Sequence, residues 1–169
     1  MTKDQKAVAI AAPAGVLFMI LSVWILGQRL PVPHAPATAD RLVYALKWDA
    51  LPAALFLLMI VAVGNGRFLG LAIDPTLGNE GHRLKVNARV VDNTAQQLLL
   101  FVVASLAIAA QLEPGRLPLI GAAAITFVLV RLAFWVGYQI RPVHRAFGFA
   151  GTCSLNFAML AAVLWLSLR

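Results

Sequence analysis

The chain has 169 residues, of which 61% are hydrophobic and 12% are charged, and its mean hydropathy is +0.83. Soluble domains carry about 25% charged residues, so this balance excludes a soluble globular protein and predicts an integral membrane protein. The formal charge of +7 does not indicate a nucleic-acid partner, because the Lys and Arg residues fall in short segments between apolar runs, with no basic helix beside an aromatic platform.

Five apolar segments approach the roughly 20 residues that a hydrocarbon core of about 30 Å requires of a spanning helix. They are residues 7–26, 46–63, 86–110, 117–140 and 148–168. The second is the least regular, since Lys47, Asp49 and Pro52 mark its start and the sequence GNGR (64–67) punctuates its end. Pro52 is acceptable near a first turn, where its missing N–H has no intrahelical partner.

The first segment follows Lys3 and Lys6, so it could be a membrane anchor or a cleaved signal peptide. An Ala-x-Ala at 37–39 is a candidate cleavage site, but it lies far downstream of the apolar run. The run is also longer than the roughly 7–15 residues of a signal sequence. These features favour an uncleaved anchor, whereas cleavage would leave four helices.

Lys and Arg are distributed unevenly over the two sides of the predicted membrane. One side collects Lys3, Lys6, Arg67, Arg83, Lys85, Arg89, Arg141 and Arg145, and the other Arg29, Arg41, Lys47, Arg116 and Arg169. The positive-inside rule therefore places the N-terminus and the loops 64–85 and 141–145 in the cytoplasm. With five spans, the C-terminus faces the opposite side.

The connections between the spans carry clear turn signals. The loop 64–85 is rich in Gly and contains the turn sequence Asp-Pro-Thr at 74–76. In QLEPGRLP (111–118), Pro114 and Gly115 predict a tight hairpin, so the third and fourth helices should be antiparallel neighbours.

The third segment begins with polar side chains. Arg89, Asn93 and Gln96 stand at positions i, i+4 and i+7, which places them on one helix face within two turns. An arginine near the headgroups can snorkel to water, but the shorter amides cannot. An unpaired amide in hydrocarbon costs several kcal/mol, so Asn93 and Gln96 should face another helix or a wet pocket.

The fourth segment carries an arginine inside its apolar run. Arg131 precedes the sequence LAFWVGY, and a charge at this depth is a functional-site hypothesis by default. Arg131, Tyr138 and Arg145 recur every seven residues, nearly on one face, although Pro142 could break the last turn. The alternative is a structural pair between Asp92 and Arg131 that joins two helices, and it could coexist with a ligand site.

These segments resemble the MAPEG family, the membrane-associated proteins in eicosanoid and glutathione metabolism. The sequence RVVDNTAQQ (89–97) is similar to the family motif Arg-x-x-x-Asn-x-x-Glu, and RLAFWVGYQIRPVHR (131–145) is similar to the next family helix, with Gly-Tyr followed seven residues later by Arg. The resemblance covers residues 46–169. It implies an all-α polytopic bundle with a four-helix domain at 46–169, preceded by an additional transmembrane helix and loop at 1–45.

The resemblance implies a homotrimer that binds glutathione between subunits near the cytoplasmic face. By motif, Arg89 and Asn93 would bind the tripeptide, and Arg67 would match the family's basic residue at the end of its first helix. Arginine suits this ligand, because guanidinium groups recognise carboxylates in a bidentate manner.

The same resemblance assigns roles in a reaction. Tyr138 would line the site, and Arg145 would stabilise the glutathione thiolate. A thiol with a pKa near 8.5 is mostly protonated at neutral pH and only the thiolate is nucleophilic, so a nearby cation is needed. The thiolate would attack a hydrophobic electrophile or a lipid hydroperoxide arriving from the bilayer.

The chain departs from the family pattern at three positions. Gln96 replaces the family glutamate, which removes the natural partner of the glutathione ammonium. Asp92 is a poor substitute for that carboxylate, because it lies about 100° away from Asn93 around the helix. Gln97 and Phe134 stand where some catalytic members carry tyrosines. These departures favour the alternative, a non-catalytic lipid-binding or scaffold protein of the same fold.

Other functional classes have less support. A transporter or channel subunit would need a series of acidic residues that forms a conduction path with Arg131, and the sequence shows no such series. The three histidines, His34, His82 and His144, lie in different loops without metal-ligand spacing, so no metal is expected. A glutathione-dependent transferase or peroxidase remains the predicted function.

Overall fold

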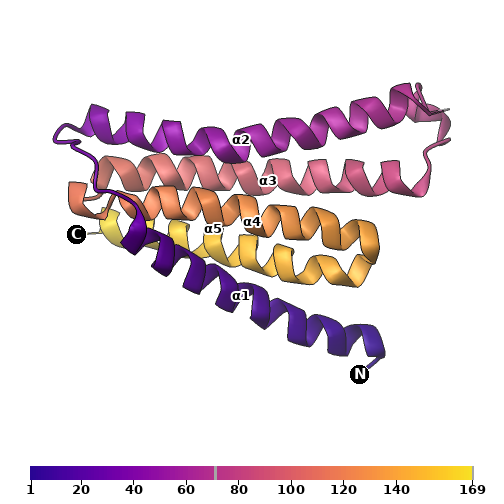
Figure 1. Ribbon diagram of the computed structural model, residues 1–169, viewed down its shortest axis with the longest axis horizontal. Coiled ribbons are helices and arrows are strands. Elements are labelled where there is room, and N and C mark those ends of the chain that lie inside the picture. Colours follow the sequence, from indigo (N-terminus) through magenta and orange to yellow (C-terminus); the bar gives the residue numbers. More distant parts are fainter. Residues whose placement is uncertain (71, 169) are drawn as a thin grey trace.

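The computed structural model describes residues 1–70 and 72–168, and these form a bundle of five long helices (Figure 1). Three short 3-10 helices, η1–η3, stand in the connections. The elements are α1 (Lys3–Arg29), α2 (Thr38–Phe68), η1 (Pro75–Leu77), α3 (His82–Gln111), η2 (Pro114–Arg116), α4 (Pro118–Ile140), η3 (Pro142–His144) and α5 (Arg145–Ser167).

Three of the five predicted spans, 7–26, 46–63 and 86–110, fall within these long helices, and the spans 117–140 and 148–168 each exceed their helix by one residue. Each helix is long and apolar enough to cross a membrane. The all-α membrane fold predicted from the sequence is therefore confirmed. The limits of the second span were wrong, because α2 begins at Thr38 and continues through 64–67 to Phe68. Pro52 thus lies inside α2 and not in its first turn. Neighbouring helices allow a membrane helix to contain such a proline.

Successive helices run in opposite directions, so the N-terminus and the C-terminus lie at opposite ends of the bundle (Figure 1). Helix α2 packs against α3 and α4, whereas α1 crosses α4 and α5 obliquely. The hairpin at 111–118 is confirmed: η2 joins α3 to α4, and the two helices lie antiparallel.

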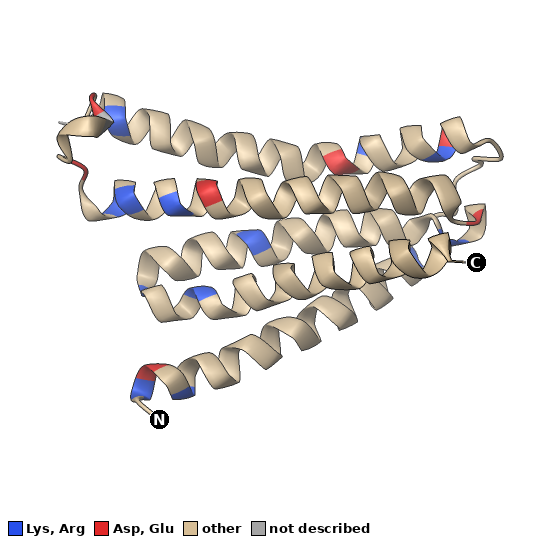
Figure 2. Ribbon diagram, turned by 180° about the vertical axis from the view of Figure 1, so that it is seen from behind, with Lys and Arg blue, Asp and Glu red and all other residues tan. Residues whose placement is uncertain are grey.

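Basic residues are found at both ends of the bundle (Figure 2). The start of α1, the α2–α3 connection and the α4–α5 connection share the end that was predicted to be cytoplasmic. Arg169, which the sequence analysis assigned to the other end, lies outside the described residues. Which side of the membrane each end of the bundle faces stays a prediction.

The α2–α3 connection has the predicted turn at Asp74. Oδ1 of Asp74 accepts hydrogen bonds from the backbone N–H of Thr76 at 2.8 Å and from its hydroxyl at 2.6 Å. These bonds stabilise the charged form and hold the pKa of the Asp74 carboxyl below its usual value. Gly78 then takes a left-handed conformation, with φ of 71°, which glycine adopts without strain.

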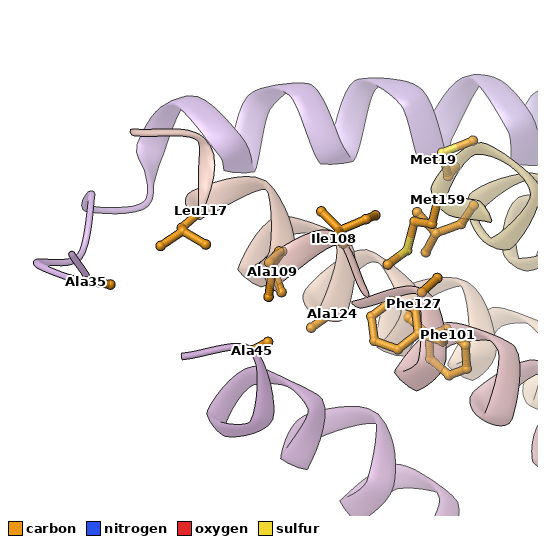
Figure 3. Packing of buried hydrophobic residues seen from close by; sticks show 14 residues of the cluster. Met19, Ala35, Ala45, Phe101, Ile108, Ala109, Leu117, Ala124, Phe127 and Met159 are labelled. Carbon is orange, nitrogen blue, oxygen red and sulfur yellow. The ribbon is translucent and has the colours of Figure 1, made fainter. Parts of the chain in front are cut away.

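Aromatic and small residues build the core. Phe101 on α3 and Phe127 on α4 are both fully buried, with ring centroids 4.8 Å apart (Figure 3). Gly148 on α5 allows close helix approach, because a Cβ there would collide with the carbonyl oxygen of Val130 and the backbone of Phe134. The tight α4–α5 contact at Gly148 positions the site described next.

Candidate functional site

A polar pocket of about 340 Å³ lies between α3, α4 and α5, near the end of the bundle where α4 turns into α5. Its lining combines two guanidinium groups, one carboxylate, two amides, a phenol and two phenyl rings. The lining residues are Arg89, Asp92, Asn93, Gln96, Phe134, Tyr138, Arg145 and Phe149.

Helix α3 supplies one wall of the pocket. Arg89, Asn93 and Gln96 share one face, as the spacing predicted, and Asp92 borders the same space. Arg89, Asp92 and Gln96 are exposed, whereas Asn93 is half-buried. The wall therefore offers a cation, an anion and two amides to a ligand that approaches from the surface of this chain.

The opposite wall contains Tyr138 and Arg145, and the break between α4 and α5 brings them together. The backbone of Arg141 is extended (φ −154°, ψ 142°) because Pro142 follows it, so α4 ends at Ile140. Of the residues that recur every seven positions, α4 therefore carries Arg131 and Tyr138 but not Arg145. Arg145 begins α5 after η3. Its guanidinium carbon lies 4.6 Å from the centroid of the Tyr138 ring, a cation–π contact.

Arg131 lies behind the pocket and does not line it. It is completely buried, and its Nη1 and Nη2 donate to Oδ1 of Asn93 at 2.8 and 3.1 Å. Nε donates to the hydroxyl of Thr152 at 3.1 Å, and the guanidinium carbon lies 4.2 Å from the centroid of the Phe134 ring. Arg131 therefore ties three helices together and holds two pocket residues, Asn93 and Phe134.

The alternative pair between Asp92 and Arg131 does not form. Within the described part of the chain, the one ion pair joins Arg67 to Glu80, with Nη2 and Oε1 3.3 Å apart. Neutral oxygens surround Arg131 in place of a carboxylate, since Asn93, Thr94 and Thr152 accept its bonds. Asp92 is left facing the pocket.

Arg67 is not among the pocket residues. It lies in the last turn of α2, half-buried, and pairs with Glu80 just before α3 begins. The resemblance matched Arg67 by its place at a helix end, and a position of that kind does not specify which way the side chain points.

Sequence reasoning did not identify Phe149, Thr94 or Thr152. Phe149 stands four residues after Arg145, so helical spacing alone places both on one face of α5. Thr152 donates to the carbonyl of Gly148 at 2.7 Å, a common local bond that does not indicate a contact with Arg131. Across the described residues, no cluster of three or more His, Cys, Asp or Glu side chains could hold a metal ion.

The sequence also matches a family model, described as MAPEG family, over residues 7–165. The chain belongs to the MAPEG family. No curated protein and no solved structure matches it. The matched stretch of this MAPEG protein begins within α1, so it includes the helix that the resemblance had set apart as an addition. The boundary at residues 45 and 46 stays a prediction.

The three departures from the MAPEG motif take definite places in the structure. Gln96 lines the pocket with Asp92, so the wall keeps one carboxylate although the motif glutamate is missing. Phe134 contacts Arg131 and Tyr138, because the Arg131 guanidinium lies over its ring and the ring meets that of Tyr138 edge-on at 5.8 Å. Gln97 lies outside the pocket, where its side-chain oxygen accepts a bond from Asn156 at 2.8 Å.

Proposed function

We propose that this MAPEG protein binds glutathione in the pocket and uses its thiolate to attack apolar electrophiles or lipid hydroperoxides from the bilayer. The observation that carries the proposal is the joint placement of Arg89, Asn93, Tyr138 and Arg145 around one pocket of about 340 Å³. That volume lies within the roughly 300–1,000 Å³ typical of small-molecule sites.

The charges of the pocket complement those of the tripeptide. Glutathione carries two carboxylates and one ammonium, and the walls present two guanidinium groups and one carboxylate. Arg89 would hold a carboxylate by two parallel hydrogen bonds. Asp92 would face the ammonium and so take over the role of the missing glutamate.

Arg145 would supply the chemistry. A guanidinium beside a thiol would lower the pKa of that thiol and favour the nucleophilic thiolate. The contact with Tyr138 fixes this cation at the wall of the pocket. In conjugation, the thiol proton passes to solvent, sulfur forms a bond to the electrophilic carbon, and the leaving group departs with the bonding electrons.

A homotrimer fits this proposal, because the pocket is open on one chain. Arg89, Asp92, Gln96 and Arg145 are all exposed, and charges buried between subunits would act in a lower dielectric. A neighbouring copy laid over this face would close the site. Cross-linking in native membranes would test the proposal, and a monomer as the sole species would contradict it.

Calorimetric titration of glutathione into the purified protein in detergent tests the activity. We expect Arg89→Ala to weaken binding at least tenfold, and Arg145→Ala to retain binding but lose the ultraviolet absorbance of the thiolate. Arg141→Ala is the matched control, since Arg141 is exposed at the same end and does not line the pocket.

A non-catalytic lipid-binding or scaffold role is the second candidate. It is favoured by Phe134, which has no hydroxyl to offer the thiol, and by the amide of Gln96. Failure of the wild type to bind glutathione at millimolar concentration would support this role and reject the enzyme.

A further inference from the structure

A second cavity lies at the opposite end of the bundle from the polar pocket. It has a volume of about 310 Å³ and lies between α1, α3, α4 and α5. Its inner wall is built from buried apolar side chains, among them Met19, Ile108 and Met159 from three different helices (Figure 3). No residue deep in this cavity is charged.

The shape of the cavity suits one hydrocarbon chain. Its lining follows α5 from Leu155 to Leu166, which a helix covers in about 16 Å. Apolar cavities of this kind stay dry. Because the surrounding helices lie in lipid, an acyl chain is the molecule available to fill the space.

The outer end of the cavity is charged. Arg116 lines the apolar cavity and also an adjoining polar pocket, where it meets Gln111 and Glu113. Arg116 and Glu113 are both exposed, and no ion pair joins them, since the described residues form the Arg67–Glu80 pair alone. One guanidinium and one carboxylate are therefore available to a ligand at this end.

We propose that the apolar cavity binds one acyl chain of a phospholipid whose head group carries a phosphate and an ammonium, as in phosphatidylethanolamine. The phosphate would lie on Arg116, since guanidinium groups bind phosphate in a bidentate manner, and the ammonium would face Glu113. A fatty acid or phosphatidylglycerol lacks the ammonium and would bring only negative charge to Glu113. The site is independent of glutathione, because it shares no residue with the polar pocket.

Photolabelling of the full chain in maltoside detergent tests this proposal. The probe is a phosphatidylethanolamine with a diazirine near the end of one acyl chain, and mass spectrometry maps the labelled residues. We expect labels on cavity residues of α1 and α5, such as Met19 and Met159. Ala162→Phe fills the cavity and should lower this labelling at least tenfold, whereas Ala161→Phe, an exposed neighbour outside the cavity, should not.

Competition identifies the head group. Unlabelled phosphatidylethanolamine should displace the probe at several-fold lower concentration than phosphatidylglycerol or oleate, and Glu113→Gln should remove this preference. Arg116→Gln should weaken binding of the probe several-fold, with Arg29→Gln as a control at the same end of the bundle. Equal labelling of Ala161→Phe and Ala162→Phe, or equal competition by all three lipids, would overturn the proposal. If Ala162→Phe does not fold, the competition order with wild type and Arg116→Gln decides it.

Discussion

Both terminal nitrogens of Arg131 donate to a single oxygen of Asn93, at 2.8 and 3.1 Å. This leaves the amide NH2 group of Asn93, which has no partner among the described residues, available to donate to a ligand in the pocket. A buried arginine on α4 thus decides whether a pocket residue on α3 acts as a donor. An amide held this way suits a carboxylate or a peptide carbonyl.

Replacement of Arg131 by lysine tests this relationship. One ammonium cannot reach Asn93 and Thr152 together with the geometry of a planar guanidinium, although the charge is kept. We expect the free energy of unfolding to fall by about 1–3 kcal/mol, because polar groups lose their partners. Glutathione affinity should fall several-fold by calorimetry. Arg141→Lys is the control, and an Arg131→Lys variant with unchanged affinity would reject the positioning role.

Gln96 offers a test of ligand charge. Gln96→Glu adds a second carboxylate to the pocket wall, so we expect glutathione to bind several-fold more tightly through its ammonium. Asp92→Asn should have the opposite effect. Gln97→Glu places the same charge outside the pocket and keeps an acceptor for Asn156, so its affinity should equal that of wild type. A weaker complex in Gln96→Glu would contradict the proposed orientation.

The contact between α4 and α5 depends on Gly148. Gly148→Ala forces a methyl group into the backbone of Val130 and Phe134, so the free energy of unfolding should fall by about 1–3 kcal/mol, as in other overpacked cores. Gly64→Ala is a matched control, because no atom lies within 4 Å of its added Cβ. Alanine should stabilise α2 there by about 0.5–1 kcal/mol. Thermal unfolding in detergent measures both, and equal melting temperatures would argue against the close packing.

Asp49 tests how the bundle accommodates an acid inside a span. It is 5% exposed, its Oδ1 accepts a bond from Ser105 at 2.9 Å, and its Oδ2 is buried without a partner. Ser105→Ala removes the single bond and should lower the free energy of unfolding by about 1–3 kcal/mol. Asp49→Asn keeps the volume and that bond without a titratable group, so its stability should match or exceed that of wild type. Loss of stability in Asp49→Asn would show that the acid itself is required.

Reporter fusions test the orientation of the chain. The positive-inside rule predicts a cytoplasmic N-terminus, and the five helices place the C-terminus at the other end of the bundle. Alkaline phosphatase, active outside the cytoplasm, should therefore be active at residue 168 and inactive when fused after the α2–α3 connection. The reverse pattern would reverse the assigned orientation.

Sequence patterns predicted the helices better than their limits. Hydropathy detects the apolar part of α2, but its polar first turns around Asp40 and Arg41 carry no such signal, so the predicted span began too late. Local helical spacing grouped Arg89, Asn93 and Gln96 correctly on one face. The partners of Arg131 could not be predicted, because Asn93 and Thr152 reach it only through the packing of α3 and α5 on α4.

The unequal lengths of the helices have a consequence for access to the pocket. Helix α2 spans about 46 Å and α4 about 35 Å, against a hydrocarbon thickness of about 30 Å. Helices α2 and α3 also extend beyond α4 and α5 at the end that holds the pocket (Figure 1). In the proposed reaction the pocket would therefore lie at the edge of the hydrocarbon core, where glutathione would enter along the projecting ends of α2 and α3 and an apolar reactant would enter sideways from the acyl chains.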